Sequence, residues 1–398
     1  MFFRILLKKS ILLFRRFFFD SLTAFQKPKP FYLRAISKES KNQKIIHLCK
    51  KSNFSNKPFI LSDFHSIRPA YTKNQKEILE WIADAHLFVQ AKENKWEKSD
   101  PAYAQFHQEI KKVLEELGLG DGKIGYRGLH LADFMKDKWE ETEIFRLDQY
   151  FTGEQLGKRK EFFDQEVGKI FARFYQDKEN PPSHLIHVTC TGYAAPSGAQ
   201  RIVSEKKWGE KTVVSHAYHM GCYAAFPALR MAVGYTSQES ITDIVHTEMC
   251  SLHFNPTLHQ KEQLVVQTLF ADGFIKYSVS TKNNIQAPCL KILALQEEII
   301  PHTTSHMSWR FHPWGMQMSI AKEVPVMIKR HINAFLKRLE EKAKCCLTKS
   351  FYAIHPGGPK IIQQLQEILQ LDNSQVEHSK NILFSYGNMS SATLPHVW

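Results

Sequence analysis

The sequence has few cysteines for its length, and they form no recognisable framework. Seven cysteines occur in 398 residues, the number is odd, and no two stand in a Cys-x-x-Cys pair. Zinc sites and disulfide-stapled secreted domains both depend on paired, regularly spaced cysteines. The pattern therefore argues against both, and it favours reduced thiols in the cytoplasm, one of which is available for catalysis.

Long apolar runs are also lacking. No uncharged stretch approaches the ~20 residues that a transmembrane helix needs. Residues 1–56 instead alternate Phe-rich clusters with basic pairs and hold 13 Lys and Arg against two acids. Three interpretations stay open: residues 1–30 lie weakly on an anionic membrane surface, the segment is a targeting leader, or it is an extension without a role. Deletion of residues 1–56 is expected to leave turnover unchanged, and on the first interpretation to abolish binding to anionic vesicles.

The basic balance of the chain is concentrated in that segment. The formal net charge is +13, and residues 1–56 alone carry +11, so the other 342 residues are close to neutral at +2. A protein that tracks the phosphates of a nucleic acid needs a basic groove in its folded body. The charge distribution therefore gives no reason to expect a nucleic-acid partner.

The pattern of apolar residues divides the chain into a basic extension and linker (1–57) and two parts of an α/β body (58–289 and 290–398). Alternating strands and helices predict an α/β fold with a mostly parallel sheet. Two rounds of alternation suggest two related halves. The expected strands are 59–61, 184–190, 212–217, 241–247, 263–267, 274–280, 291–294 and 351–354. The expected helices are 74–87, 107–117, 158–175, 197–207, 222–234, 324–342, 359–369 and 374–381.

The strongest local signal surrounds Cys222. The stretch Thr212–Ala217 reads as a buried strand, a tight turn follows, and Cys222 opens an apolar helix. A helix N-terminus offers unpaired N–H groups and a partial positive charge, which favour thiolate over thiol. This strand–turn–helix arrangement presents nucleophiles in many enzymes, although a buried structural cysteine is the commoner fate of Cys.

Two further segments add hydrogen-bond donors. An apolar run ends in His355 and is followed by Pro-Gly-Gly-Pro, and Asn388 follows a glycine at a loop-to-helix boundary. Condensation of thioesters needs a thiolate that holds an acyl group and two donors aimed at the oxygen where negative charge develops. An imidazole and a carboxamide suit that task because neither adds a competing negative charge.

Other patterns carry no chemistry. The Gly-x-Gly-x-x-Gly match at 120–125 follows a helix instead of opening one, so it is interpreted as a loop. His302, His306 and His312 lack a carboxylate or cysteine at ligand spacing and are interpreted as loop histidines. No metal is expected.

These residues resemble the active-site motifs of type III polyketide synthases of the chalcone and stilbene synthase family. The order Cys, His, Asn and the 33-residue gap between His355 and Asn388 match, and the resemblance covers about residues 58–398. It does not cover the extension. The segments that carry it are the stretch around Cys222, His-Pro-Gly-Gly-Pro at 355–359, Tyr-Gly-Asn-Met-Ser-Ser at 386–391, Gly-Lys-Arg at 157–159 and Lys-Glu-Val-Pro at 322–325.

The resemblance implies a role for each catalytic residue. Cys222 would take an acyl group from a CoA thioester, and His355 and Asn388 would orient malonyl-CoA and stabilise its enolate. Phe270 matches the family's gatekeeper aromatic, whereas Met318 stands where a second gatekeeper aromatic is expected.

Cavity-shaping positions of the family fall on His253 and Ser390, with His253 replacing a smaller polar side chain. Plain core packing is the alternative for Phe270 and Met318.

By the same resemblance, the fold is thiolase-like, with two related βαβ halves that form an α-β-α-β-α core. The expected protein is a cytoplasmic or membrane-peripheral homodimer that needs no cofactor besides its acyl-CoA and malonyl-CoA substrates. The product would be an alkylpyrone or alkylresorcinol, and a flexible, apolar Met318 favours a fatty starter. Two rivals stay open: a 3-oxoacyl-[acyl-carrier-protein] synthase III-like enzyme, and a catalytically silent relative that serves as a dimer partner.

The chain ends ten residues after Asn388. Relatives continue into a final pair of strands and a Gly-Phe-Gly-Pro-Gly loop that borders the cavity, and no such motif occurs here. The expectation is therefore a C-terminal half that is incomplete and a chain that is poorly soluble or inactive as given.

Overall fold

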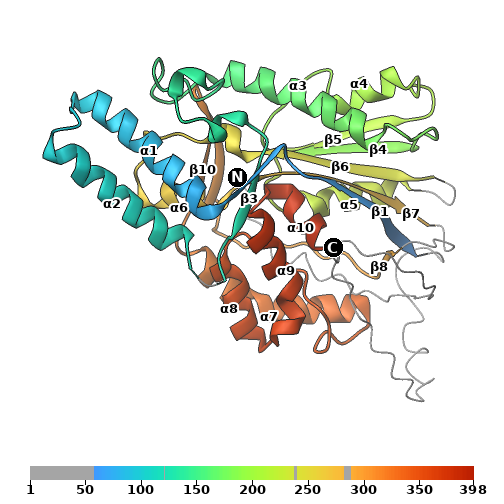
Figure 1. Cartoon of the computed structure of the whole chain (residues 1–398). Helices are drawn as coiled ribbons and strands as arrows, with labels where there is room; N and C mark the ends of the chain where they lie inside the picture. Colours follow the sequence, from blue (N-terminus) through green and yellow to red (C-terminus); the bar gives the residue numbers. More distant parts are fainter. Residues whose placement is uncertain (1–57, 121, 237–239, 282–287) are drawn as a thin grey trace, which may run out of the picture.

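The central element of the fold is a six-stranded sheet with the order β5-β4-β6-β7-β1-β8 (Figure 1). The structure, a computed structural model, describes residues 58–120, 122–236, 240–281 and 288–398. Its strands are β1 (Phe59–Ile67), β4 (His184–Thr189), β5 (Val213–Tyr218), β6 (Thr242–Met249), β7 (Asp272–Ser280) and β8 (Leu290–Ile292). Two small ladders join β2 (Tyr71–Asn74) to β3 (Tyr126–Leu129) and β9 (Met307–His312) to β10 (Gly315–Ile320).

The α/β class is confirmed, but the expectation of a mostly parallel sheet is wrong. β4 pairs in parallel with β5 and β6, whereas β7 is antiparallel to β6 and to β1, and β1 is antiparallel to β8. The crossover helices that follow β4 and β5 produce the parallel part, because parallel neighbours need such a connection. β1 comes from the start of the folded body and enters the sheet between β7 and β8.

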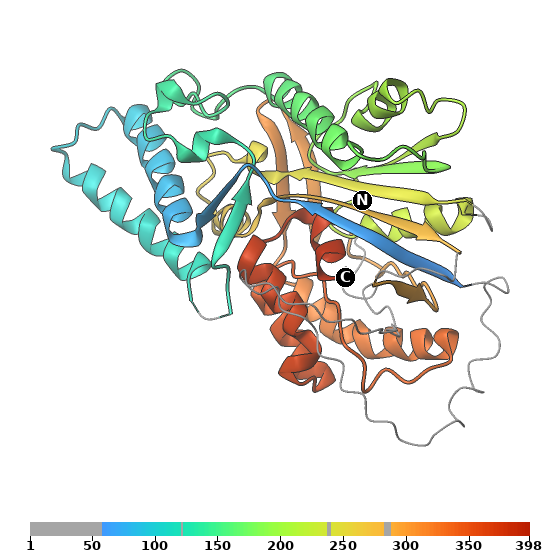
Figure 2. The same cartoon turned by 45° about the vertical axis from the view of Figure 1, so that its right-hand side comes forward.

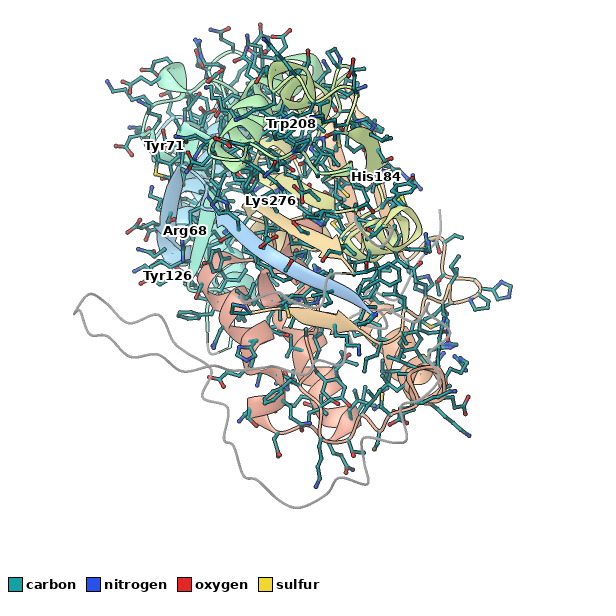
Figure 3. The ribbon with its side chains drawn as sticks, turned by 90° about the vertical axis from the view of Figure 1, so that its right-hand side faces the viewer. Arg68, Tyr71, Tyr126, His184, Trp208 and Lys276 are labelled. Atoms are coloured by element: carbon teal, nitrogen blue, oxygen red, sulfur yellow. The ribbon has the colours of Figure 1, made fainter. Side chains whose placement is uncertain are left out.

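Helices pack around the sheet. Figures 1 and 2 show α3 and α4 together at one side of the molecule, with α7, α8 and α9 at the other. Figure 3 shows the same arrangement from the side, with Trp208 next to α3 and α4 and Lys276 on β7 in the sheet. The helices are α1 (Gln75–Asn94), α2 (Pro101–Gly118), α3 (Leu156–Phe174), α4 (Gly198–Glu205), α5 (Ala225–Tyr235), α6 (Lys261–Leu269), α7 (Val324–Ala343), α8 (Pro359–Leu369), α9 (Asn373–Tyr386) and α10 (Thr393–Val397).

Two of the expected strands have another structure. The run at 263–267 is part of α6, and residues 351–354 form no strand among the described residues. In the second case the backbone bonds to α9 instead: Tyr352 N donates to Gln375 O at 2.7 Å, and Ile354 N donates to Ser379 Oγ at 2.9 Å. Short apolar runs do not distinguish strand from helix, so the tertiary contacts decide.

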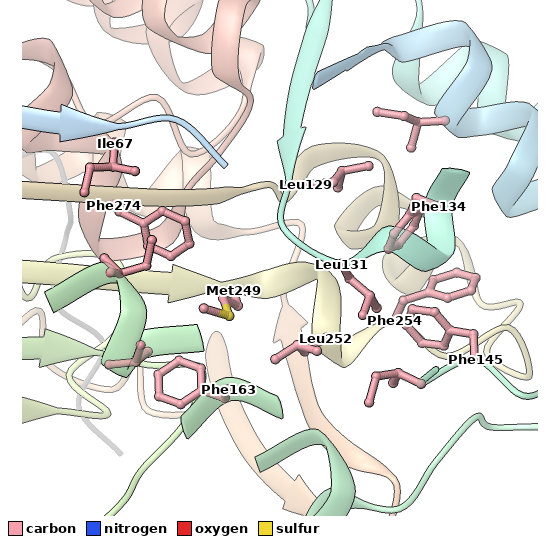
Figure 4. Packing of buried hydrophobic residues seen from close by; sticks show 14 of the residues in the cluster. Ile67, Leu129, Leu131, Phe134, Phe145, Phe163, Met249, Leu252, Phe254 and Phe274 are labelled. Atoms are coloured by element: carbon pink, nitrogen blue, oxygen red, sulfur yellow. The ribbon is translucent and has the colours of Figure 1, made fainter. Parts of the chain in front are cut away.

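The largest apolar core lies between α1, α2, α3 and the sheet. Phe163, Val167 and Phe171 follow one another at four-residue spacing on α3 and are buried, which is the pattern of a helix with one apolar face. Further along, the rings of Phe134, Phe145 and Phe254 gather at the end of β6 (Figure 4), and the Phe145 and Phe254 centroids are 5.4 Å apart. Aromatic rings at such distances stabilise one another beyond their buried area.

Helices α7, α8 and α9 form a second core of their own. This C-terminal part joins the sheet through a short parallel bridge between Phe270 and Asn388. Trp398, directly after its last helix, packs against α5 and β7. The Trp398 ring lies edge-on to the rings of Phe226 and Tyr277, with centroid distances of 6.0 and 5.8 Å. Residues 388–398 are therefore packed against the same sheet that carries Cys222.

Interpretations that concern residues 1–57 lie outside the described residues. Among the residues that the structure does describe, no helix combines the length and the apolar character needed to cross a bilayer.

Close packing at Gly273 allows a test of how the C-terminal part is held. A Cβ at this position in β7 would lie 2.4 Å from the Met389 sulfur and 2.8 Å from the Met389 Cβ. Gly273→Ala should therefore displace Met389 and lower the free energy of unfolding by about 1–3 kcal/mol, the usual effect of overpacking. Thermal or urea melts would measure the loss.

Gly209→Ala is the matched control, because a Cβ there meets nothing within 4 Å. Equal melting behaviour of Gly273→Ala and the unaltered protein would contradict the packing between β7 and the segment that carries Asn388.

Candidate active site

Cys222 lies in the turn that joins β5 to α5. His219 and Gly221 have positive φ angles of 54° and 82°, which produce the sharp change of direction after the strand. The helix begins at Ala225, so the sequence-based start at Cys222 is three residues too early. Cys222 therefore precedes the helix N-terminus. Cys222 is only 5% exposed to solvent.

His355 lies in the extended segment before α8. Its residue is 1% exposed, and neither ring nitrogen has a hydrogen-bond partner among the described residues. Burial lowers the pKa of the imidazole to about 3, so the ring is neutral at physiological pH. A neutral imidazole with both nitrogens unused offers one donor and one acceptor to a ligand.

Asn388 follows Gly387, whose φ of 74° ends α9. The Asn388 N–H donates to Leu269 O and its carbonyl accepts from Ala271 N, both at 2.9 Å. In the side chain, Oδ1 accepts from Ser390 N at 3.0 Å, which orients the amide with its NH2 group toward the His355 segment. These bonds fix a buried carboxamide, which is 1% exposed, between the strand start of β7 and the chain before α8.

A path of contacts connects the three predicted catalytic residues. Ser390 lies beside the Cys222 thiol and acts to lower its pKa, and the Ser390 N–H donates to the Asn388 amide oxygen. Asn388 Nδ2 in turn donates to Gly357 O at 3.3 Å, two residues after His355. The structure thus brings together residues that lie up to 166 positions apart in the sequence. A thiol, a neutral imidazole and a carboxamide donor share one buried region.

Burial acts against the thiolate that the helix N-terminus was expected to favour. Desolvation raises the pKa of Cys222 to about 12; Ser390 opposes this shift and nearby Glu248 adds to it. The cause is that a buried charge loses its hydration, and Cys222 lies before the helix instead of within its first turn. Burial therefore favours the thiol, against the tendency expected from a helix N-terminus, and a base must take the Cys222 proton before the sulfur can attack.

This protonation state predicts a distinct pH profile for alkylation. Between pH 7 and 9.5 the thiolate fraction of a thiol with a pKa well above this range rises about tenfold per unit. The rate at which iodoacetamide labels Cys222 should therefore rise throughout, with no plateau, because the thiolate is the nucleophile. Mass spectrometry of the labelled peptide would measure it.

Cys346 provides the internal reference, because it is exposed and its hydrogen bonds to Thr348 lower the pKa of its thiol. It should react faster than Cys222 at pH 7. A Cys222 rate that levels off near pH 7 would indicate a thiolate–imidazolium pair and contradict the neutral resting state.

The sequence-based reading missed two residues near Cys222. Glu248, at the end of β6, is fully buried; its carboxylate accepts from Cys190 N at 3.0 Å and from the Thr191 hydroxyl at 2.9 Å, and it also binds Ser391. Burial raises its pKa to about 7. The Cys190 sulfur accepts from Gly221 N at 3.1 Å, directly beside Cys222. The strand that carries Glu248 also contains Asp243 and His246, so the sequence offered no distinctive signal for Glu248.

The predicted substrate-binding residues separate into two groups. Phe270, Met318 and His253 line one cavity, as expected, whereas Ser390 lies at the Cys222 thiol. His253 is fixed there as a neutral ring: Nε2 donates to Thr191 O at 2.8 Å and Nδ1 accepts from Met316 N at 3.2 Å. The cavity also has aromatic and thioether walls that the sequence did not reveal, from Phe134, Phe254, Trp309, Trp314 and Met316.

None of the three predicted catalytic side chains is among the described residues that line this cavity. Phe270 connects the two regions, because its side chain lines the cavity and its backbone bridges to Asn388. Trp309 makes a second connection, since its indole N–H donates to Cys190 O at 2.6 Å. The cavity is therefore a neighbour of the Cys222 region, separated from it by Phe270 and the β9–β10 hairpin.

A cysteine at a strand–turn–helix junction, a neutral histidine and an asparagine lie on a mixed α/β fold. Comparison with solved structures confirms the fold. The chain is similar to the C-terminal type III polyketide synthase domain of Steely1 from Dictyostelium (TM-score 0.71, 23% identity, 85% of this chain and 90% of that one). It is equally similar to PKS-I of the brown alga Ectocarpus siliculosus (TM-score 0.72, 20% identity, 87% and 89%).

Residues 291–398 match the family described as chalcone and stilbene synthases, C-terminal domain. Among curated proteins, the chain is 28% identical over 224 residues to "Probable polyketide synthase 1" of Dictyostelium discoideum and 27% identical over 224 residues to "Type III polyketide synthase A" of Arabidopsis thaliana. It is 26% identical over 223 residues to "Putative chalcone synthase" of Bacillus subtilis. The resemblance seen in the sequence is confirmed: the chain is similar to type III polyketide synthases.

The matches to curated proteins cover only part of each. They include 54% of this chain, 7% of the Dictyostelium protein, 56% of the Arabidopsis protein and 60% of the Bacillus protein.

Proposed function

We propose that this protein is a type III polyketide synthase that condenses an acyl-CoA starter with malonyl-CoA. The observation that carries the proposal is the contact path that joins Cys222, Asn388 and the His355 segment through Ser390 and Gly357. The two unused nitrogens of His355 support it further, since a buried polar group without a partner is unfavourable unless a ligand uses it.

In the first half-reaction, neutral His355 would accept the Cys222 proton while the sulfur attacks the thioester carbonyl of the starter. The tetrahedral intermediate collapses when the C–S bond to CoA breaks, and the CoA thiolate takes up a proton. The low pKa of His355 means that the imidazolium forms only transiently, so the proton passes on to the leaving thiol. Cys222 then holds the acyl group as a thioester.

In the second half-reaction, malonyl-CoA loses carbon dioxide and leaves an enolate whose oxygen carries the negative charge. The Asn388 NH2 group and the N–H of His355 would donate to that oxygen. The enolate carbon attacks the Cys222 thioester, a C–C bond forms, and the Cys222 sulfur leaves. Both donors are neutral and buried, so their hydrogen bonds would strengthen as the charge develops.

The cavity beyond Phe270 would receive the acyl chain. Phe134, Phe254, Met316 and Met318 make its wall apolar, which suits a fatty starter and an alkylpyrone or alkylresorcinol product. We also propose that the protein acts as a homodimer.

One incubation would test this function. The protein is mixed with ¹³C-malonyl-CoA and a panel of acyl-CoA starters, and mass spectrometry follows labelled products. The expected result is a labelled polyketide from at least one fatty acyl-CoA, and none with Cys222→Ala. A product that forms only when malonate is supplied on an acyl carrier protein would favour the 3-oxoacyl synthase rival, and no product under any condition would favour a silent relative.

A further inference from the structure

Arg127, in β3, is a buried arginine whose hydrogen-bonding capacity is only partly used. The residue is 3% exposed, and Nη1 donates to Gln267 O at 2.7 Å and to Phe270 O at 2.9 Å. Its Nε and Nη2 atoms are also buried, and among the described residues they have no partner. One edge of the guanidinium, formed by these two nitrogens, therefore makes no hydrogen bond to the described residues.

A second buried arginine in this fold, Arg159, has hydrogen-bond partners for all of its side-chain nitrogens. Arg159 is 0% exposed, and each of its three nitrogens donates to backbone carbonyls: Nε to Glu154 O at 2.7 Å, Nη1 to Leu252 and Phe254, and Nη2 to Thr152. The contrast matters because a buried charge without full pairing is strongly unfavourable. Arg127 lacks the partners that Arg159 has.

The nearest acid does not supply them. Asp272 contributes a favourable charge at a distance, but both its oxygens are used elsewhere. Oδ1 accepts from Ser251 N at 2.8 Å, and Oδ2 accepts from Ser251 Oγ and from His130 N, both at 2.6 Å. Asp272 forms no ion pair with Arg127 in the part of the chain that the structure describes.

The Arg127 side chain is part of the wall of the cavity already described. Arg127 lines it together with Phe134, Phe254, Trp309 and Met318, and it is the one charged side chain among the described lining residues. The wall includes no carboxylate, and its histidine, His253, is neutral because burial lowers its pKa to about 3. A ligand in this space would meet a mainly apolar surface with a single cation and a few uncharged polar side chains, among them Ser251, Asn255 and Gln317.

We propose that this cavity binds a ligand with an apolar chain and one carboxylate, and that the carboxylate pairs with Nε and Nη2 of Arg127. The two N–H groups on that edge are parallel and match the two oxygens of a carboxylate in a bidentate pair. A dianionic phosphate would need further positive partners, which the described walls do not offer. The inference rests on the proposed function for its substrate: the starter would be an acyl-CoA whose acyl chain bears a carboxylate at its far end.

Binding to the full 398-residue chain tests the proposal without turnover. Isothermal titration calorimetry at pH 7.5 compares decanoate with 1-decanol, two probes of equal chain length that differ in charge. Decanoate should bind about tenfold more tightly or better, the effect of a buried charge-assisted pair. Arg127→Gln should remove that preference, whereas Arg173→Gln, the same change on an exposed residue of α3, should keep it.

Equal affinity of the two probes for the unaltered protein would overturn the proposal, and so would a preference that survives in Arg127→Gln. Arg127 also supports two backbone carbonyls, so a circular-dichroism melt must show that the variant folds. If it does not, Arg127→Lys serves instead: a lysine keeps the charge but cannot form the bidentate pair, so the preference should fall several-fold. An unchanged preference in Arg127→Lys would likewise overturn the proposal.

Rates of product formation test the carboxylate site separately from the proposed polyketide synthase function. The enzyme is offered decanoyl-CoA and the mono-CoA thioester of decanedioic acid, each with malonyl-CoA. A faster rate with the dicarboxylic starter, lost in Arg127→Gln, supports the assignment. Products from decanoyl-CoA at the greater rate would support the polyketide synthase and overturn the carboxylate-bearing starter, and carboxylate-selective binding without any product would support the site and count against the enzyme.

Discussion

Replacing Cys222 with Ala is expected to abolish the acyl-enzyme and, with it, all condensation. The sulfur is the atom that would hold the acyl group, and alanine offers no substitute nucleophile. The expected loss of product exceeds about 10³-fold, the size seen when a covalent nucleophile is removed. Intact-protein mass spectrometry after incubation with a fatty acyl-CoA would show the acyl mass on the unaltered chain and no added mass on the variant.

The fold should survive this change. Cys222 is buried in a turn, and the substitution removes one sulfur, so the free energy of unfolding should change by about 1 kcal/mol or less. Cys190→Ala is the matched control, since it deletes a second buried thiol beside the same turn without touching the predicted nucleophile. Acyl mass that maps to Cys190 or Cys250 in the unaltered protein would contradict the assignment of Cys222.

The candidate catalytic residues could be identified in the sequence because each stands in a local pattern. The strand before Cys222, the glycines after His355 and the glycine before Asn388 all indicate sharp turns that end an element and present a side chain. The structure places these three turns in one region. Local patterns were also sufficient for most helices, such as α7, whose apolar residues recur at helical spacing.

Properties that depend on the sum of many neighbours could not be predicted in this way. The raised pKa of Cys222 follows from burial by residues far away in the sequence, and so does the raised pKa of Glu248. Arg127 is an ordinary basic residue in the sequence, and only the structure shows that two of its nitrogens lack partners. The strand predicted at 263–267 was wrong for a related reason. The Leu-Val-Val sequence at its centre is compatible with a strand or a helix, and packing against α2 and β10 selects the helix.

Replacing His355 or Asn388 with Ala should slow malonyl-CoA decarboxylation by about 10²–10³-fold each, the usual effect of losing one donor to a developing oxyanion. The enolate carries its charge in a buried region where water cannot replace a lost donor. Release of ¹⁴C-carbon dioxide from labelled malonyl-CoA would measure this step by itself.

Self-acylation of Cys222 should distinguish the two residues. His355→Ala also removes the base that would accept the thiol proton, whereas Asn388→Ala leaves that base in place. We therefore expect acylation by a fatty acyl-CoA to fall further in His355→Ala than in Asn388→Ala. Asn388 also supports Ser390 N through its amide oxygen, so a melting curve of Asn388→Ala must show that the loss of this acceptor leaves the fold intact. Small and equal effects of His355→Ala and Asn388→Ala in both assays, with melting curves unchanged, would show that neither side chain stabilises the enolate.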